Sequence, residues 1–109
     1  MATFFITGIR GFIGTYLANL LSSRGHHVKG IDNLSSSGYE KLNSEIDFKQ
    51  ADILKIEEYN DFIKGSDYII HLAAMSRSGP SKGKDLFCLE QNVYGTQKVL
   101  EASIENKLK

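Results

Sequence analysis

The sequence has no tryptophan, one proline and one cysteine, Cys88. A lone cysteine cannot form a disulfide within the chain, and the first residues lack the features of a secretory signal. We therefore expect a cytoplasmic location. Long apolar runs are also missing, because even residues 68–72 fall far short of the roughly 20 residues that a membrane-spanning helix needs. No membrane partner is expected.

Charge of one sign is not in excess either. The 13 Lys and Arg residues balance 13 Asp and Glu residues. The basic surplus that binds phosphate backbones is therefore absent, and we do not expect a nucleic-acid partner. Of the 109 residues, 41% are hydrophobic and 24% are charged, as in ordinary globular proteins. This length suits one domain, which we place at residues 1–109.

The first third of the chain has the pattern strand, turn, helix, strand. Residues 3–7 are β-branched or aromatic and are followed by Gly8, which predicts a strand. Apolar residues at helical spacing then predict one apolar helical face: Ile13, Leu17, Leu20 and Leu21. Gly25 stands where a helix commonly ends. Residues 27–32 form the second predicted strand, with Asp32 at its end.

The same alternation continues along the chain. Residues 46–49 alternate apolar with polar and predict a half-exposed or edge strand. Helical spacing over 56–63, ended by Gly65, precedes an apolar run at 68–72 that is typical of a central parallel strand. A last amphipathic helix is predicted from four apolar residues, which we expect in the core or in an interface: Leu89, Val93, Leu100 and Ile104.

This order of elements, with a short helix between the second and third strands, predicts an α/β fold. Right-handed crossovers give a doubly wound parallel sheet with helices on both faces and strand order 3-2-1-4. The arrangement corresponds to the first half of a Rossmann-like fold plus one strand. Strand four then lacks an outer neighbour, and its open edge could pair with another chain.

A glycine-rich turn joins the first strand to the first helix. Gly8, Gly11 and Gly14 are spaced G-x-x-G-x-x-G, one residue different from the dinucleotide fingerprint. The spacing alone is weak evidence. Its context strengthens it, because a predicted strand precedes the turn, a predicted helix follows it, and Asp32 ends the next strand.

The chemistry of a dinucleotide accounts for these residue types. Gly8 and Gly11 would let a pyrophosphate approach backbone N–H groups at the start of a helix. The Asp32 carboxylate can accept hydrogen bonds from both ribose hydroxyls and would repel a 2′-phosphate, which favours NAD over NADP. Arg10 could pair with a phosphate of either cofactor. In the alternative interpretation the glycines are ordinary turn and cap residues and Asp32 is a solvated strand end.

Five segments in order resemble successive signatures of the extended short-chain dehydrogenase/reductase family. They are residues 7–14, 31–38, 51–53, 71–74 and 92–96. Within that family the chain is similar to the NAD-dependent nucleotide-sugar epimerases and dehydratases of the UDP-glucose 4-epimerase type. The resemblance covers nearly the whole chain.

The resemblance implies a role for each matching residue. In this family the glycine turn, here Gly8, Gly11, Phe12 and Ile13, holds the pyrophosphate. The adenosine ribose is held by the residues that match Asp32, Asn33, Ser35, Ser36 and Ser37, and the adenine edge by those that match Asp52 and Ile53. Leu72, Ala73 and Ala74 resemble the stretch under the central phosphates and nicotinamide ribose, and Asn92 the asparagine that supports the active site. The implied cofactor is NAD.

Members of this family also use a Tyr-x-x-x-Lys pair, which exchanges a proton with a sugar hydroxyl while NAD takes the hydride. That pair and the substrate domain lie beyond the matched segments. Tyr94 and Lys98 have the same spacing, which we interpret as coincidence because Tyr94 matches a variable position. We expect a cofactor-binding portion that is inactive alone and meets a nucleotide-sugar only when a C-terminal part completes it.

Two alternatives to that expectation remain open. The chain could be a free-standing dinucleotide-binding module or one chain of a split enzyme that acts with a partner. It could also be a degenerate protein that keeps the fold without ligand binding.

Two further expectations concern His71 and the last helix. His71 lies in an apolar strand without a second ligand at metal spacing, so we expect a core histidine and no metal site. The last helix resembles the one through which family members pair. We therefore expect a homodimer through residues 89–104 or through the open edge of strand four.

Overall fold

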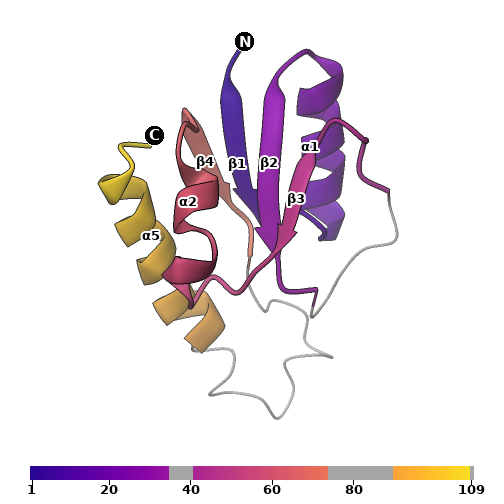
Figure 1. Cartoon of the computed structure of the whole chain (residues 1–109). Coiled ribbons are helices and arrows are strands. Elements are labelled where there is room, and N and C mark those ends of the chain that lie inside the picture. The colour runs from indigo at the N-terminus through magenta and orange to yellow at the C-terminus, as the bar shows by residue number, and fades with distance from the viewer. Residues whose placement is uncertain (35–40, 74–89, 109) are drawn as a thin grey trace.

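The structure, a computed structural model, describes residues 1–34, 41–73 and 90–108 (Figure 1). Its sheet has four strands: β1 (Thr3–Thr7), β2 (His27–Asp32), β3 (Asp47–Gln50) and β4 (Tyr68–His71). They lie in the order β3-β2-β1-β4, and every neighbouring pair is parallel. The predicted α/β fold and strand order are confirmed.

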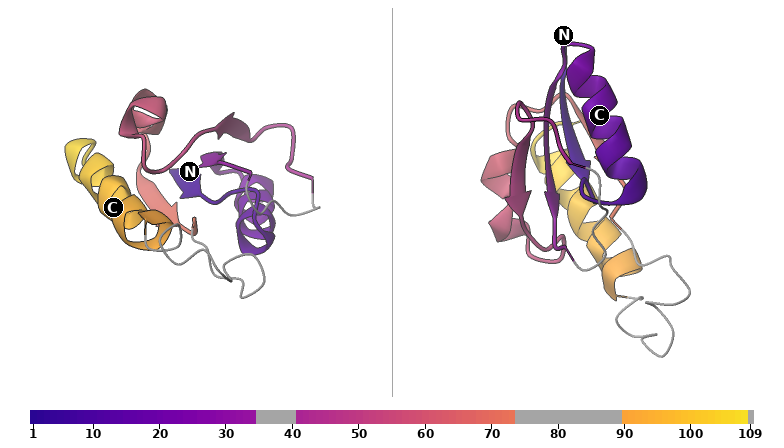
Figure 2. Two further views of the ribbon diagram at one scale, coloured as in Figure 1. Left: turned by 90° about the horizontal axis from the view of Figure 1, so that it is seen from below. Right: turned by 90° about the vertical axis from the view of Figure 1, so that its right-hand side faces the viewer.

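Helices cover both faces of the sheet, as Figure 2 shows. Helix α1 (Phe12–Ser23) lies on one face. The other face carries the short helices η1 (Ile56–Glu58) and α2 (Asn60–Ile63), then the π-helical turn η2 (Glu90–Tyr94), which continues into α5 (Gly95–Glu105). Gly25 and Gly65 follow α1 and α2 with φ of 87° and 82°, as expected of glycines that end helices.

Each face of the sheet has its own apolar cluster. On the α2 and α5 face, Phe5 and Ile31 pack with Tyr59, Ile63 and Val99. On the α1 face, the cluster is formed by Ile6, Ile9, Ala18, Val28 and Ile46. Alternate residues of β1 thus point to opposite faces, as the two-residue period of a strand requires.

Only part of the predicted apolar face of α1 meets the sheet: Leu21 packs against the cluster of Ile6, Ile9 and Val28, but Ile13 does not. The buried residues of α1 are Gly14, Thr15 and Ala18, whereas Ile13 is 64% exposed. Small residues are needed because the helix lies very close to the preceding turn. A Cβ on Gly14 would lie 2.2 Å from the carbonyl oxygen of Gly8.

The last helix differs from the prediction in the same way. Its buried residues are Gly95, Val99, Ala102 and Ser103. Val93, Leu100 and Ile104 are 53%, 57% and 77% exposed, so they do not lie in the core, and their place in an interface stays a prediction. Leu89 lies outside the described residues. The three exposed residues lie seven and four positions apart along η2 and α5, and we call them the apolar stripe.

The two edge strands agree with the sequence prediction, whereas the segment before β3 does not. All residues of β3 are exposed, as expected of an edge strand. Within the described part of the chain, β4 forms the other edge, where the predicted order places it, and is half-buried. Residues 41–46 form no helix, which corrects the prediction of a short helix for the described part of this connection.

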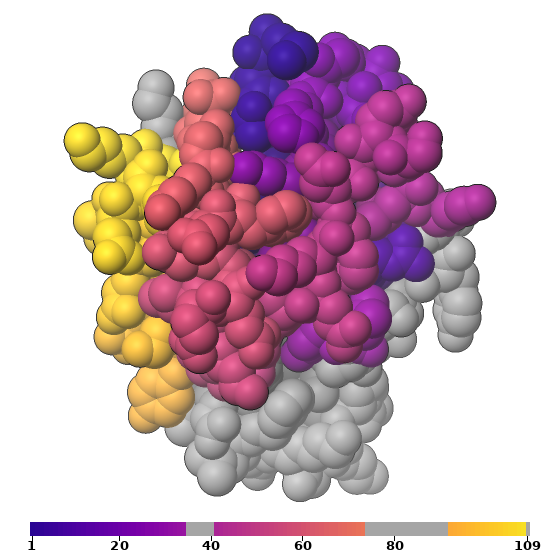
Figure 3. Space-filling model, in the orientation of Figure 1, coloured from indigo at the N-terminus to yellow at the C-terminus, as the bar shows by residue number. Residues whose placement is uncertain are grey.

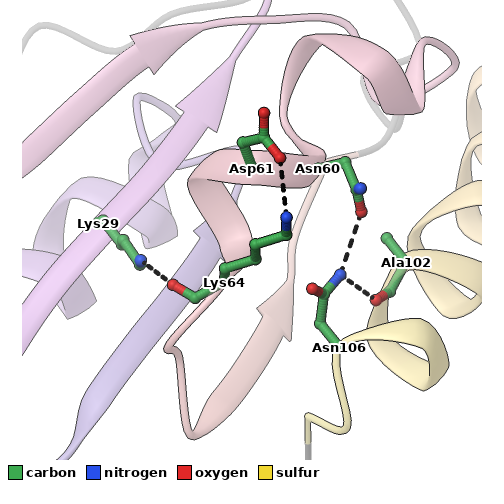
Figure 4. A network of polar contacts seen from close by, with 6 residues as sticks. All are labelled: Lys29, Asn60, Asp61, Lys64, Ala102 and Asn106. Carbon is green, nitrogen blue, oxygen red and sulfur yellow. Dashed lines mark hydrogen bonds and ion pairs between the residues drawn. The ribbon is translucent and has the colours of Figure 1, made fainter.

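Polar contacts fix the helices to each other and to the sheet (Figure 4). The side-chain amide of Asn106 donates to Asn60 Oδ1 at 3.1 Å and to the carbonyl oxygen of Ala102 at 2.8 Å. This contact joins the end of α5 to the start of α2, and Figure 3 shows the two segments side by side on one face. Lys29 of β2 donates to the carbonyl oxygen of Lys64 at 2.7 Å, and burial lowers the pKa of Lys29.

The described helices are short, with 12 residues in α1 and 11 in α5. None of those in residues 1–34, 41–73 and 90–108 is long and apolar enough to cross a membrane.

Candidate functional site

The candidate site lies where the carboxyl ends of the parallel strands meet, at the lower end of the sheet in Figure 1. Gly8 follows β1, Asp32 ends β2, residues 51–53 follow β3, and Leu72 and Ala73 follow β4. Open α/β sheets bind ligands in the crevice outside this edge. The topology therefore brings four of the sequence segments with predicted roles to one edge.

The glycine turn packs against the end of β4. Gly8 has φ of 73°, which glycine adopts without the cost that a Cβ would impose. Its backbone N–H donates to the carbonyl oxygen of Ile31 at 2.9 Å, and Gly11 N–H donates to Gly8 O at 3.0 Å. A Cβ on Gly8 would lie 2.8 Å from the backbone nitrogen of Ala73. Gly8 thus lets β1, β2 and β4 converge at the site.

The turn leads directly into the N-terminus of α1. Gly11 is the N-cap residue, makes no side-chain cap, and is followed by a first turn with no acidic residue. The N–H groups of a first helical turn have no acceptor within the helix, and the helix dipole favours negative charge there. Phe12 is largely exposed beside them. This arrangement suits an anion such as a diphosphate.

Asp32 connects the glycine turn to the segment after β2. Its Oδ2 accepts a hydrogen bond from the backbone N–H of Arg10 at 2.9 Å, and its Oδ1 accepts one from Leu34 N–H at 2.7 Å. Leu34 has φ of 64°, a conformation that costs a non-glycine residue about 1–2 kcal/mol. Each carboxylate oxygen has a second lone pair, so Asp32 can also accept hydrogen bonds from a ribose.

The turn after β3 is held by two residues that the sequence analysis did not single out as site residues. Glu58 Oε1 accepts the backbone N–H of Asp52 at 2.9 Å, and the Tyr59 hydroxyl donates to the carbonyl oxygen of Ile53 at 2.7 Å. Asp52 Oδ1 accepts the N–H of Leu54 at 3.0 Å. The side chain of Ile53 is buried in the core, so only its backbone can face a base.

Tyr59 is itself fully buried. Burial, followed by the charge of Asp52, raises the pKa of its phenol well above the ordinary value. The hydroxyl therefore stays protonated and keeps its role as a donor. No periodicity marks Tyr59 or Glu58 as residues of the site, because each acts on a backbone group six residues earlier.

The segment after β4 is fixed by Thr7. The Thr7 hydroxyl oxygen accepts the N–H of Leu72 at 3.0 Å and of Ala73 at 3.2 Å, and it lies 2.6 Å from His71 Nδ1. His71 Nε2 lies 3.0 Å from Thr96 Oγ1. His71 is half-buried and hydrogen-bonded on both ring nitrogens, as expected for a histidine of the fold. No motif or spacing indicates that His71 contacts Thr96.

The remaining predicted residues have the following places. Asn33 directly follows β2 and Asn92 is an exposed residue of η2. Ser35, Ser36, Ser37 and Ala74 lie outside the described residues. Tyr94 ends η2, and Lys98 forms an ion pair with Glu101 at 3.8 Å. Among the described residues, no group of three or more His, Cys, Asp or Glu side chains could hold a metal ion.

Comparison with known families agrees with this geometry. Residues 4–109 match the NAD-dependent epimerase/dehydratase family. The chain belongs to this family. The extended short-chain dehydrogenase/reductase resemblance, read from five short segments, is thereby confirmed.

In comparisons with individual relatives, about a third of the aligned residues are identical. The chain is 34% identical, over 95% of its length, to a UDP-N-acetyl-alpha-D-glucosaminuronate decarboxylase from Bacillus cytotoxicus. Its structure is similar to the crystal structure of UDP-glucose 4-epimerase from Thermotoga maritima with UDP-glucose, with a TM-score of 0.90, 30% identity and 98% of this chain covered. It is also similar to the Bordetella bronchiseptica enzyme WbmH in complex with NAD⁺, with a TM-score of 0.84, 32% identity and 98% coverage.

The chain spans about a third of the length of these relatives. It covers 33% of the decarboxylase, 35% of the epimerase chain and 36% of WbmH. The activity of a whole relative therefore cannot be carried over from the match alone.

Proposed function

We propose that residues 1–109 form the NAD(H)-binding portion of a nucleotide-sugar epimerase or dehydratase. The observation that carries the proposal is the position of Asp32. Its carboxylate ends β2, is bonded to the backbone of Arg10 at 2.9 Å, and lies beside a helix N-terminus that has no side-chain cap. Family membership and similarity to an enzyme in complex with NAD⁺ support the same interpretation.

The residues present fit this cofactor. NAD would supply hydride transfer when bound. Gly8, Gly11, Phe12 and Ile13 would hold its diphosphate, and Arg10 is close enough in sequence to add a positive charge. Asp32 and Asn33, with Ser35, Ser36 and Ser37, would hold the adenosine ribose. Asp52 and the backbone of Ile53 would meet the adenine, while Leu72, Ala73 and Ala74 would lie under the central part of the molecule and Asn92 beside it.

NAD is the proposed cofactor in preference to NADP. A 2′-phosphate on the ribose would meet the negative charge of Asp32 at close range. The proposal is tested by titrating the purified chain with each cofactor in a calorimeter. The wild type should bind NAD more tightly than NADP, and Asp32→Ala should lose most of this preference. Asp61→Ala, which removes a highly exposed carboxylate of α2, is the matched control and should retain it.

Catalytic competence is a separate question. We propose that this chain alone does not turn over a nucleotide-sugar, because the family's Tyr-x-x-x-Lys pair lies beyond the matched segments. Lys98 pairs with Glu101 at 3.8 Å, and this supports our interpretation of Tyr94 and Lys98 as a coincidence of spacing. Conversion of a UDP-sugar by the purified chain would refute this part of the proposal. A cytoplasmic location stays a prediction from the sequence.

A second copy of the chain is the proposed partner of α5. The support is the apolar stripe of Val93, Leu100 and Ile104, whose side chains are more than half exposed. Exposed aliphatic residues at helical spacing favour pairing of helices across a twofold axis. Sedimentation analysis of wild type and of Leu100→Gln/Ile104→Gln tests it. A dimeric wild type and a monomeric double variant would support the proposal. A wild type that is monomeric at high concentration would contradict it.

A further inference from the structure

Three side chains form a continuous polar link between β1, β4 and α5. Thr7 Oγ1 lies 2.6 Å from His71 Nδ1, and His71 Nε2 lies 3.0 Å from Thr96 Oγ1. The Thr96 hydroxyl also donates to the carbonyl oxygen of Asn92 at 2.7 Å. We call Thr7, His71 and Thr96 the His71 bridge. It joins residues at the cofactor edge of the sheet to the turn η2.

The hydrogen atoms of this bridge can be assigned from its partners. The Thr7 hydroxyl oxygen accepts N–H groups from Leu72 and Ala73; the Leu72 N–H is shared with the carbonyl oxygen of Thr7. Both lone pairs of the hydroxyl are therefore used, and its own hydrogen is left to be donated to His71 Nδ1.

The hydrogen on the other ring nitrogen, His71 Nε2, can be assigned in the same way. The hydrogen of the Thr96 hydroxyl is used by the bond to Asn92 O. Thr96 Oγ1 can then only accept from His71 Nε2, which must carry a hydrogen. Nδ1 accepts and Nε2 donates, so the bridge requires a neutral imidazole with its hydrogen on Nε2.

We propose that neutral His71 is a positioning residue for the dinucleotide: it orients the Thr7 hydroxyl that holds the backbone of Leu72 and Ala73 against the glycine turn. This inference rests on the proposed function. The contact is close, because a Cβ on Gly8 would lie 2.8 Å from Ala73 N. Displacement of Ala73 would therefore disturb the turn that is to receive the diphosphate.

Protonation breaks the bridge. A hydrogen on Nδ1 would point at the Thr7 oxygen, whose lone pairs already accept two N–H groups. Thr7 must then release Leu72 or Ala73, or turn away from His71. Burial of the ring lowers the pKa of His71, which keeps the neutral form at neutral pH.

Neighbouring charged groups are not the cause of the lowered pKa of His71. The titratable side chains described on the elements around His71 are those of Arg10 after β1, Tyr68 on β4, and Tyr94, Lys98, Glu101 and Glu105 on η2 and α5. Burial is the cause that lowers the pKa of His71, and none of these groups adds to it. The state of the bridge thus depends on His71 itself.

The first test needs no substitution. Nitrogen-15 NMR of the wild-type chain should show His71 neutral, with the hydrogen on Nε2, at about pH 7.5, and protonated with a pKa below its ordinary value of 6.5. A hydrogen on Nδ1, or titration at or above that ordinary value, would overturn the proposal.

The second test measures NAD affinity by calorimetry at about pH 8 and about pH 5. The Kd of the wild type should rise roughly threefold to tenfold at the lower pH, the worth of about one hydrogen bond. His71→Gln should bind weakly at both values with a flat profile. His27→Gln, which removes an exposed histidine bonded to Asp47, is the matched control and should keep the wild-type profile.

Thr96 allows a finer comparison that leaves the imidazole in place. Thr96→Ser keeps the hydroxyl and should bind NAD as the wild type does. Thr96→Val removes it and should raise the Kd by a similar factor, with circular dichroism confirming that both variants are folded. NAD binding unchanged in both His71→Gln and Thr96→Val would overturn the positioning role alone. No NAD binding by the wild type at either pH would overturn the proposed function as well.

Discussion

Asp32 at the end of β2 accepts a hydrogen bond, 2.9 Å long, from the backbone N–H of Arg10 in the turn after β1. The two residues are 22 positions apart in the chain. This contact fixes the acidic side chain relative to the glycine turn before any ligand arrives. Pre-organisation of this kind reduces the cost of ordering groups on binding.

The first prediction concerns this contact. Asp32→Ala removes acceptors for the N–H groups of Arg10 and Leu34, and should lower the free energy of unfolding by about 1–3 kcal/mol. Urea denaturation measures the change. The control Asp61→Ala removes a carboxylate that is 94% exposed, and should stay within about 0.5 kcal/mol of the wild type. Equal stability of both variants would show that the Asp32 contacts contribute nothing.

The second prediction concerns the close approach of α1 to the turn. Gly14→Ala places a Cβ 2.2 Å from Gly8 O and 3.0 Å from Ile9 Cα, so the helix must move. We expect a loss of about 1–3 kcal/mol in unfolding free energy. Tyr16→Ala on the same helix removes an exposed ring and should cost about 0.5 kcal/mol or less. Thermal unfolding distinguishes the two, and an unchanged Gly14→Ala protein would contradict the packing described.

The third prediction concerns the turn after β3. Tyr59→Phe leaves the carbonyl oxygen of Ile53 without its 2.7 Å donor in a fully buried place. An unsatisfied buried acceptor costs about 1–3 kcal/mol, measured by denaturant unfolding. Tyr16→Phe removes an exposed hydroxyl and is the matched control, with no measurable change expected. If Tyr59→Phe also left the free energy of unfolding unchanged, the Tyr59 hydroxyl would not contribute to holding the turn.

The fourth prediction is a dependence of stability on pH. The pKa of His71 is lowered in the folded state relative to its ordinary value of 6.5, so the unfolded chain takes up the proton first as pH falls. The free energy of unfolding should therefore decrease as pH drops through 6.5. The slope for one proton is at most about 1.4 kcal/mol per pH unit, and the decrease ends once the folded state is protonated too.

Urea denaturation at several pH values measures this contribution. The substitution His71→Gln should flatten the profile, whereas His27→Gln should leave the His71 contribution in place. A stability that rises on acidification in the wild type, and not in His71→Gln, would contradict the sign worked out from burial.

The strand order and the glycine turn could be predicted because their signals are local. The β-branched and aromatic run at residues 3–7, followed by Gly8, predicts both a strand and the residue at which it ends. The preference for right-handed crossovers then limits the possible strand orders. Asp32 could be placed for the same reason, since it ends a strand next to the turn. These local signals were sufficient to predict the fold and the part of the candidate site formed by the glycine turn and Asp32.

The buried faces of the helices could not be predicted in this way. Apolar spacing selected Ile13 and Leu100, yet the buried clusters on the sheet contain Ala18 of α1 and Val99 and Ala102 of α5. The distance between a helix and the sheet determines whether large apolar residues or small residues are buried between them. That distance is set only when the whole chain packs, so local spacing does not predict it. The link between His71 and Thr96, 25 residues apart, depends on the same packing.

The central claim is that an adenine dinucleotide lies across the carboxyl ends of β1 and β2. NMR of the labelled chain during addition of NAD tests it most directly. We predict that the largest shifts of backbone amide signals occur at Gly8, Gly11, Asp32 and Ile53, and that Asp32→Ala needs a higher NAD concentration to produce those at Gly8, Gly11 and Ile53. Shifts confined to the opposite end of the strands, or none at saturating NAD, would contradict the account.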